Sequence, residues 1–170
     1  AGPSGGMIGP AYARAHPERV RALLIIDTGP GFKKDEARDA WNKRAHETAD
    51  RFDREGLAVL KSLSAERASV AHRDAGGLAR AARGMLTQRD ASVMEILPHI
   101  KVPSLVVVGA DDTPFIAASD YMAAKIPGAQ KAVISAAGHA ANIDQPEAFN
   151  DAVTSFLDRL DGRHTKRAAS

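Results

Sequence analysis

The run Val102–Gly109 constrains the fold more than any other part of the sequence. It reads Val-Pro-Ser-Leu-Val-Val-Val-Gly, and its apolar, mostly β-branched residues do not alternate with polar ones. Such a strand has to be covered on both faces, which is typical of parallel sheets with helices on each side. The run Val20–Asp27 has the same character, and Lys131–Ser135 is a third expected strand. The sequence therefore predicts an α/β fold with a parallel sheet of about three strands.

Helical patterns flank these strands. We expect a helix over residues 5–16, which Pro17 ends because proline disfavours helical geometry in the residue before it. Two further helices are expected over residues 116–126 and 146–160, on either side of the last strand. These helices would cover the faces of the sheet.

The pattern changes between about residues 32 and 100. Apolar residues such as Trp41 and Phe52 recur there at helical spacing, so mostly amphipathic helices are expected. We expect a single domain over residues 1–161 that contains this helical region. Residues 162–170 are polar and basic and are expected to form a disordered tail.

Composition narrows the class of protein. The chain has 170 residues, of which 44% are hydrophobic and 26% charged, enough to bury one core. The formal net charge is only +2 and bases are interspersed with acids, so we expect no nucleic-acid partner. No apolar stretch approaches the roughly 20 residues of a membrane span, and the opening residues lack the pattern of a signal peptide. We therefore expect no membrane partner.

Cysteine is absent from the chain. Disulfides, thiolate chemistry and zinc–thiolate sites are therefore not expected. The absence of cysteine suits a cytoplasmic protein. The histidines other than His139 show no metal-ligand spacing, so surface or packing roles are expected for them. We expect a cytoplasmic protein without a metal or cofactor.

Residues with catalytic potential follow the late strands. Asp111 and Asp112 come directly after the run that ends at Gly109, and His139 follows the strand Lys131–Ser135. The carboxyl ends of parallel strands are where ligands and catalytic groups collect in open α/β sheets. An imidazole and a carboxylate are therefore expected at the same edge of the sheet.

A candidate nucleophile stands near the beginning of the sequence. Gly2, Ser4 and Gly6 form a G-x-S-x-G pentapeptide, the pattern that presents a serine on a sharp strand-to-helix turn. The pentapeptide alone is weak, because small residues are common in ordinary turns. The order Ser4, Asp112, His139 is the order of the triad in the α/β-hydrolase fold and differs from that of the chymotrypsin and subtilisin folds.

With these motifs the chain closely resembles the C-terminal two-thirds of an α/β-hydrolase, in the branch of esterases, enol-lactonases and carbon–carbon bond hydrolases. The resemblance covers about residues 1–160. It includes the segment Ala13–Val20, which is similar to the connection after the nucleophile helix, and Asp144–Phe149, which is similar to the opening of the last helix. The region from about 32 to 100 would then be the helical cap of the family.

The resemblance implies a serine hydrolase acting on carboxylic esters of small acyl substrates. Ser4 would be the nucleophile, His139 the base, Asp112 the acid that orients the imidazole, and the N–H of Gly5 an oxyanion-hole donor. Asp112 is preferred because the family places its acid three residues after a glycine, here Gly109. Asp111 stays open as an alternative, and so does Asp27, because some relatives carry the acid after the preceding strand, although a loop cap is the use that we favour for Asp27.

The chain also departs from the family pattern. Family members have strands before the elbow, and a loop among them supplies a second oxyanion donor; only Ala1-Gly2-Pro3 precedes Ser4 here. Pro3 stands directly before the serine, and Pro10 lies inside the nucleophile helix, where it removes a backbone hydrogen bond. The alternative interpretation is therefore a non-catalytic, truncated hydrolase fragment that acts as an interaction module.

The resemblance also predicts an exposed strand edge. In the family the strand 20–27 lies beside the strand that leads into the elbow, and that neighbour is not in this sequence. An uncovered apolar strand presents a row of N–H and C=O groups, which proteins pair, cover or charge to avoid aggregation. We expect a homo-oligomer, most simply a two-fold dimer, that covers the edge 20–27.

Overall fold

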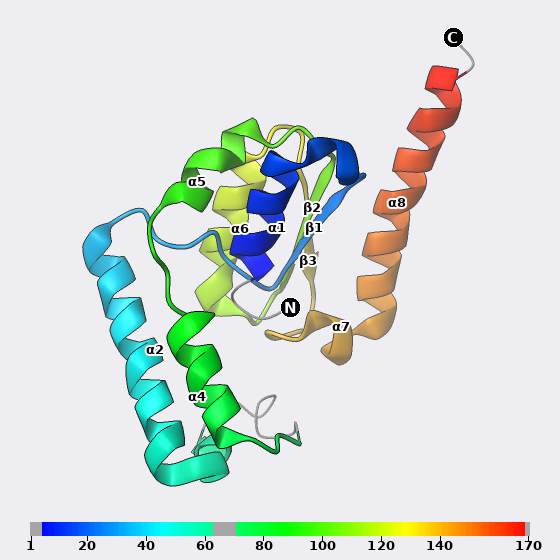
Figure 1. The fold of residues 1–170 in the computed structure, drawn as a ribbon. Helices are drawn as coiled ribbons and strands as arrows, with labels where there is room; N and C mark the ends of the chain where they lie inside the picture. The colour runs from blue at the N-terminus through cyan, green and yellow to red at the C-terminus, as the bar shows by residue number, and fades with distance from the viewer. Residues whose placement is uncertain (1–4, 63–70, 169–170) are drawn as a thin grey trace. The chain divides into compact units, whose positions relative to one another are not determined.

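The computed structural model describes residues 5–62 and 71–168. The chain divides into two compact units (Figure 1). The first, Ala1–Pro30 with Val93–Ser170, carries the sheet and is called the sheet unit here. The second, Gly31–Ser92, consists of helices and is called the helical unit. The helical region is therefore narrower than the expected 32–100.

The sheet unit contains three parallel strands among the described residues. They are β1 (Leu23–Ile26), β2 (Ser104–Gly109) and β3 (Gln130–Ile134), in the order β1-β2-β3. Leu23 pairs with Ser104, and Gly109 pairs with Ile134. Every residue of β2 is buried because this strand lies in the middle of the sheet with helices on both faces. The predicted α/β fold with three strands is confirmed.

Alternate residues of the strands face two separate cores. On one face, α1 (Gly5–Ala15) and α6 (Thr113–Lys125) cover the sheet, and on the other face lies α8 (Pro146–Ala168) (Figure 1). The first core joins residues of these helices to one set of strand residues: Ala13, Met122 and Ile126 from α1 and the end of α6, and Leu23, Ile25 and Val106 from the strands. The second core joins Phe156 and Leu160 of α8 to the other set of strand residues, Leu105, Val107 and Ile134.

Short elements connect the strands and helices, and one of them shows that the helical unit ends before the expected residue 100. They are η1 (Pro17–Arg19), α5 (Ser92–Ile96), η3 (Leu97–His99) and α7 (Ala141–Asp144). Leu97 and Ile100 were expected in the helical region but are fully buried in the first core of the sheet unit. Burial of these two large side chains beside the sheet explains why the helical unit ends at Ser92.

The last helix is longer than expected. The sequence predicts a helix over 146–160 and a disordered tail from 162, whereas α8 continues to Ala168. Phe156 and Leu160 anchor the helix to the second core. No proline follows Pro146 in α8, and helix propagation costs little once the first turns are packed. The expected disordered tail is therefore helical over most of its length.

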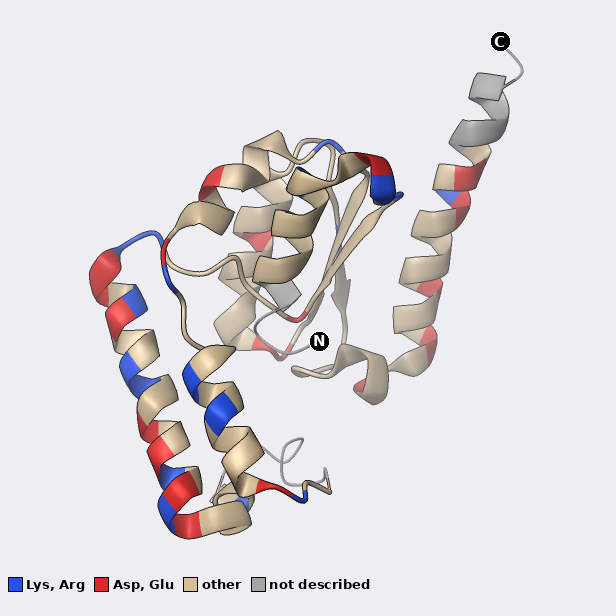
Figure 2. Ribbon diagram, viewed as in Figure 1, with Lys and Arg blue, Asp and Glu red and all other residues tan. Residues whose placement is uncertain are grey.

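The helical unit has a core of its own. It contains α2 (Asp35–Glu55), η2 (Gly56–Ser62) and α4 (Ala75–Gly84). Gly56 ends α2 with a φ of 62°, a left-handed value that favours glycine. The outer face of α2 carries acids and bases in alternation (Figure 2). The core is formed by small and large apolar residues: Ala49, Phe52, Val59, Leu60, Ala79 and Ala82.

Two segments of the helical unit are joined by a polar network. The side chain of Asn42 in α2 donates to the carbonyl of Gln88 at 2.8 Å and accepts from its N–H at 2.7 Å. The Gln88 side chain in turn accepts from the N–H of Phe32 at 3.1 Å. Gln88 therefore ties the segment that enters the unit to the one that leaves it.

Candidate active site

Asp112 and His139 meet at the carboxyl edge of the sheet. Asp112 follows β2 and stands at the N-cap position of α6, while His139 lies in the turn between β3 and α7. The Nδ1 atom of His139 is 2.9 Å from an Oδ atom of Asp112. The Asp112 side chain is 6% exposed and that of His139 23% exposed. The two residues that the sequence analysis placed at this edge are therefore in direct contact.

Backbone hydrogen bonds extend beyond the β2–β3 ladder and bring the two residues together. The N–H of Ala110 donates to Ile134 at 2.8 Å, and the N–H of Asp111 donates to Ala137 at 2.9 Å. Gly109 permits this close approach, because a Cβ there would lie 2.2 Å from the carbonyl oxygen of Gly138. The turn that carries His139 thus lies directly against the end of β2.

Asp112 does not act as an ordinary helix cap. An aspartate at the N-cap usually accepts a hydrogen bond from an N–H of the first helical turn, but this side chain makes no such bond. Its carboxylate is directed to His139 instead. The ring of Phe115 lies beside the imidazole, with 4.8 Å between the centroids. The imidazole is therefore held on one side by a carboxylate and on another by an aromatic ring.

This contact favours one tautomer of His139. With Nδ1 hydrogen-bonded to a carboxylate, the neutral imidazole carries its proton on Nδ1 and leaves Nε2 as a proton acceptor. A histidine held in this way can act as a general base, and the carboxylate stabilises the imidazolium that forms.

Asp27 occupies a different part of the same edge. It directly follows β1, its side chain is buried, and its φ of 47° is unusual for a residue other than glycine. One oxygen accepts from the N–H of Gly109 at 3.0 Å and the other from the N–H of Ala141 at 3.2 Å. Burial raises the pKa of the Asp27 carboxyl, and the two N–H donors oppose that effect.

The three aspartates considered for the acid differ in their surroundings. Asp112 contacts the imidazole, Asp27 binds backbone N–H groups, and Asp111 is exposed. Sequence reasoning named Asp27 as an alternative acid and favoured a loop cap as its use, but it did not identify Gly109 and Ala141 as its partners. An aspartate at the end of a buried strand was the only signal available for it.

A second carboxylate holds the turn of His139 from the outside. Asp144 of α7 accepts from the N–H of Gly138 at 2.7 Å, and Gln145 donates to the carbonyl of Ala136 at 3.2 Å. Sequence analysis had placed these two residues only in the opening of the last helix. The N–H groups of Gly138 and Ala141, on either side of His139, are thus each bound by a carboxylate.

Ser4 lies outside the described residues. The helix α1 begins at Gly5, so the N–H of Gly5 belongs to the first turn of a helix, where N–H groups have no partner within the helix. The roles expected for Ser4 and Gly5 remain predictions.

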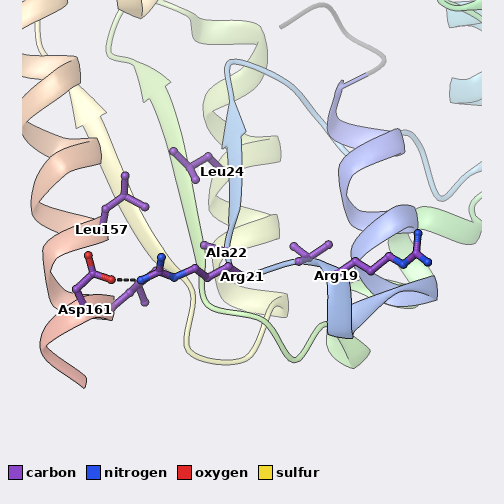
Figure 3. Close-up of a pocket in the computed structure, with 8 residues that line it drawn as sticks. Arg19, Arg21, Ala22, Leu24, Leu157 and Asp161 are labelled. Carbon is purple, nitrogen blue, oxygen red and sulfur yellow. Dashed lines mark hydrogen bonds and ion pairs between the residues drawn. The ribbon is translucent and has the colours of Figure 1, made fainter. Parts of the chain in front are cut away.

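Two hollows in the described part of the chain lie away from this edge. The larger, about 420 Å³, lies between the start of β1 and α8, with Leu24 and Leu157 along it and the ion pair of Arg21 and Asp161 across it (Figure 3). The smaller, about 190 Å³, is lined by residues such as Pro103 and Gly128 before β2 and β3. Both lie at the amino ends of the strands, opposite Asp112 and His139.

The described residues also contain no helix long and apolar enough to cross a membrane. Within the same residues, no group of three or more histidine, aspartate or glutamate side chains is arranged to hold a metal ion.

Comparisons with known proteins agree with this fold. The structure of MenH from S. aureus matches with a TM-score of 0.82 and 22% identity, over 93% of this chain and 66% of that protein, which shows the fold alone. A thermophilic esterase from Thermogutta terrifontis matches with a TM-score of 0.75 and 27% identity, over 91% of this chain and 62% of that one. The 3-oxoadipate enol-lactonase 2 of Acinetobacter baylyi is 26% identical over 92% of this chain and 61% of its own length.

The chain thus spans somewhat more than three-fifths of the length of these relatives. The model of the alpha/beta hydrolase family matches residues 4–152, which include Ser4, Asp112 and His139. This chain belongs to the α/β-hydrolase family.

Proposed function

We propose that this chain is a serine hydrolase that cleaves carboxylic esters of small acyl substrates. The observation that carries the proposal is the 2.9 Å contact between His139 and Asp112 at the carboxyl edge of the sheet, in a member of the α/β-hydrolase family. Ser4 supplies the nucleophile that this pair would activate, in the G-x-S-x-G pattern.

The mechanism assigns one task to each group. Nε2 of His139 removes the proton of Ser4 as the serine oxygen attacks the ester carbonyl, and Asp112 stabilises the resulting imidazolium. The N–H of Gly5 stabilises the negative oxygen of the tetrahedral intermediate. The imidazolium then protonates the leaving alcohol, and water, activated by the same histidine, releases the acid from Ser4.

Two further features support the proposal. The Thermogutta terrifontis relative is named as an esterase and the Acinetobacter baylyi relative as an enol-lactonase, both of which act on ester bonds. The helical unit follows the carboxyl end of β1 in the chain, the edge where Asp112 and His139 stand. We propose that the helical unit serves as a cap in this enzyme, and that the enzyme works in the cytoplasm.

The test is an esterase assay that compares the parent protein with a variant that lacks the proposed nucleophile. The protein is screened on p-nitrophenyl esters of graded chain length beside its Ser4→Ala variant, and a fluorophosphonate probe is applied to both. We expect turnover that Ser4→Ala abolishes, and a probe adduct on Ser4 located by mass spectrometry. Turnover that persists in Ser4→Ala, or an adduct elsewhere, would refute the mechanism.

The absence of any turnover and of any adduct would favour the alternative, a non-catalytic interaction module. His139→Ala is the matched second variant. It should lose about as much activity as Ser4→Ala, because members of a triad act as a unit.

A further inference from the structure

Asp27 joins the two segments that carry the proposed acid and base. Gly109, whose N–H it binds at 3.0 Å, lies three residues before Asp112. Ala141, whose N–H it binds at 3.2 Å, lies two residues after His139. Both acceptor oxygens belong to one rigid carboxylate, so this side chain adds a direct link between the end of β2 and the segment that follows His139.

The backbone bonds of Ala110 and Asp111 to Ile134 and Ala137 hold the segment before His139, but they do not reach the segment after it. The N–H of Asp27 donates to Val107 at 2.9 Å, which continues the pairing of β1 with β2. That bond does not reach the turn of His139. Only the carboxylate extends to Ala141, at the start of α7.

The arrangement is costly in free energy. The carboxylate is removed from water, since Asp27 as a whole is 2% exposed, and its backbone takes a left-handed conformation with φ of 47°. The neighbouring charge of Asp112 adds to the burial in raising the pKa of the Asp27 carboxyl. Strained residues of this kind persist where the surrounding structure fixes them, and they cluster at functional sites.

We infer that Asp27 is a positioning residue that sets the separation of Asp112 and His139 by bridging the end of β2 to the start of α7. The bridge rests on the hydrogen bonds of Asp27 alone, while its effect on turnover rests on the proposed hydrolase function. A displacement of the His139 turn would lengthen the 2.9 Å contact between the two side chains.

The first test replaces one oxygen of the bridge. In Asp27→Asn, one side-chain oxygen remains and an amide NH₂ faces a backbone N–H, so one hydrogen bond is lost. We expect faster hydrogen exchange at the Ala141 amide and an altered NMR signal of the His139 Nδ1 proton. We also expect kcat to fall about 10- to 100-fold with little change in KM, because a small misplacement of a catalytic group lowers the rate of the chemical step. Asp158→Asn, on the exposed side of α8, is the matched control.

The second test removes the donor and leaves Asp27 intact. Ala141 is the first residue of α7, a position where proline is tolerated but carries no N–H. Ala141→Pro should change the NMR signal of the His139 Nδ1 proton as Asp27→Asn does. If Asp27→Asn does not fold, this second variant decides whether the bridge positions His139.

The outcomes separate this inference from the proposed function. A folded Asp27→Asn with an unchanged His139 signal and kcat within about twofold of the parent would overturn the bridge as a positioning device. If the parent has no esterase activity, the proposed function fails, and the exchange and NMR measurements still decide whether Asp27 holds His139 against Asp112.

Discussion

At the scale of residues, the site depends on which carboxylate serves His139. Three aspartates follow β1 or β2 within a few residues, and only a carboxylate hydrogen-bonded to Nδ1 can hold the imidazole in one tautomer. Asp112 has that contact, at the expense of the cap bond it would otherwise make to α6. The geometry therefore ranks Asp112 first for the orienting role.

Asp112→Asn should lower kcat by up to about 10⁴, by analogy with the aspartate of serine-protease triads, because the asparagine amide favours the wrong tautomer. Asp111→Asn should have a minor effect, since that side chain is exposed. Steady-state kinetics on one p-nitrophenyl ester compares the two. A larger loss in Asp111→Asn than in Asp112→Asn would transfer the role to Asp111.

The raised pKa of Asp27 makes stability depend on pH. The folded protein binds the proton of the Asp27 carboxyl more tightly than the unfolded chain does. This proton binding stabilises the fold fully below about pH 3.8, the ordinary pKa of an aspartate, and the stabilisation is lost as pH rises through the raised pKa. The asparagine side chain of Asp27→Asn does not titrate, so the variant lacks this dependence on pH. The free energy of unfolding of the parent, minus that of the variant, should therefore fall across this window.

Urea unfolding at a series of pH values measures this difference. Asp158→Asn, in which the side chain is exposed, is the control for the substitution itself. A difference between the parent and Asp27→Asn that stays flat or grows with rising pH would contradict the assignment.

At the scale of elements, the site depends on how closely the turn after β3 approaches the end of β2. Gly109 belongs to β2 and lies against the carbonyl groups of Ala137 and Gly138, with no room for a side chain. The neighbouring atoms are backbone atoms, which cannot rotate away as a side chain would. The turn and the strand end therefore fit only with glycine at this position.

Gly109→Ala should lower the free energy of unfolding by about 3 kcal/mol or more, because a Cβ would overlap backbone oxygens and separate the turn from β2. Urea unfolding followed by circular dichroism measures the loss. Gly84→Ala is the matched control, since open space surrounds that position at the end of α4, and it should be neutral or slightly stabilising. Equal stability of the two variants would show that the turn adapts.

At the scale of the whole molecule, β1 is an edge strand of the described sheet. Leu24 of β1 and Leu157 of α8 lie along the hollow beside it, and Leu157 is 42% exposed (Figure 3). Apolar edges of this kind are paired or covered in natural proteins. We propose that a second copy of the chain covers this edge in a two-fold dimer.

Size exclusion with light scattering should therefore give the mass of a dimer at micromolar concentration. Leu157→Lys, which places a charge on the exposed apolar surface beside β1, should shift the protein toward a monomer without unfolding it. Val133→Lys, at an exposed position of β3 on the opposite edge of the sheet, should leave the mass unchanged. A well-behaved monomer of the parent protein would refute the dimer.

The sequence by itself determined the fold class and the order of the groups at the site. Short, β-branched apolar runs such as Leu105–Val108 favour strands covered on both faces, and such local patterns place Asp112 and His139 at strand ends without reference to contacts. The family resemblance supplied the pairing of these two residues with Ser4, whose role stays a prediction.

The family resemblance favoured Asp112, but only the tertiary structure decided that Asp112 and not Asp111 touches His139, because these neighbours in sequence differ in the direction and burial of their side chains. It also decided that Leu97 belongs to the sheet unit and that Asp27 bridges Gly109 to Ala141. These contacts join residues far apart in the chain. A periodic pattern reports which face of an element is apolar, whereas the partner of that face is fixed by packing in three dimensions.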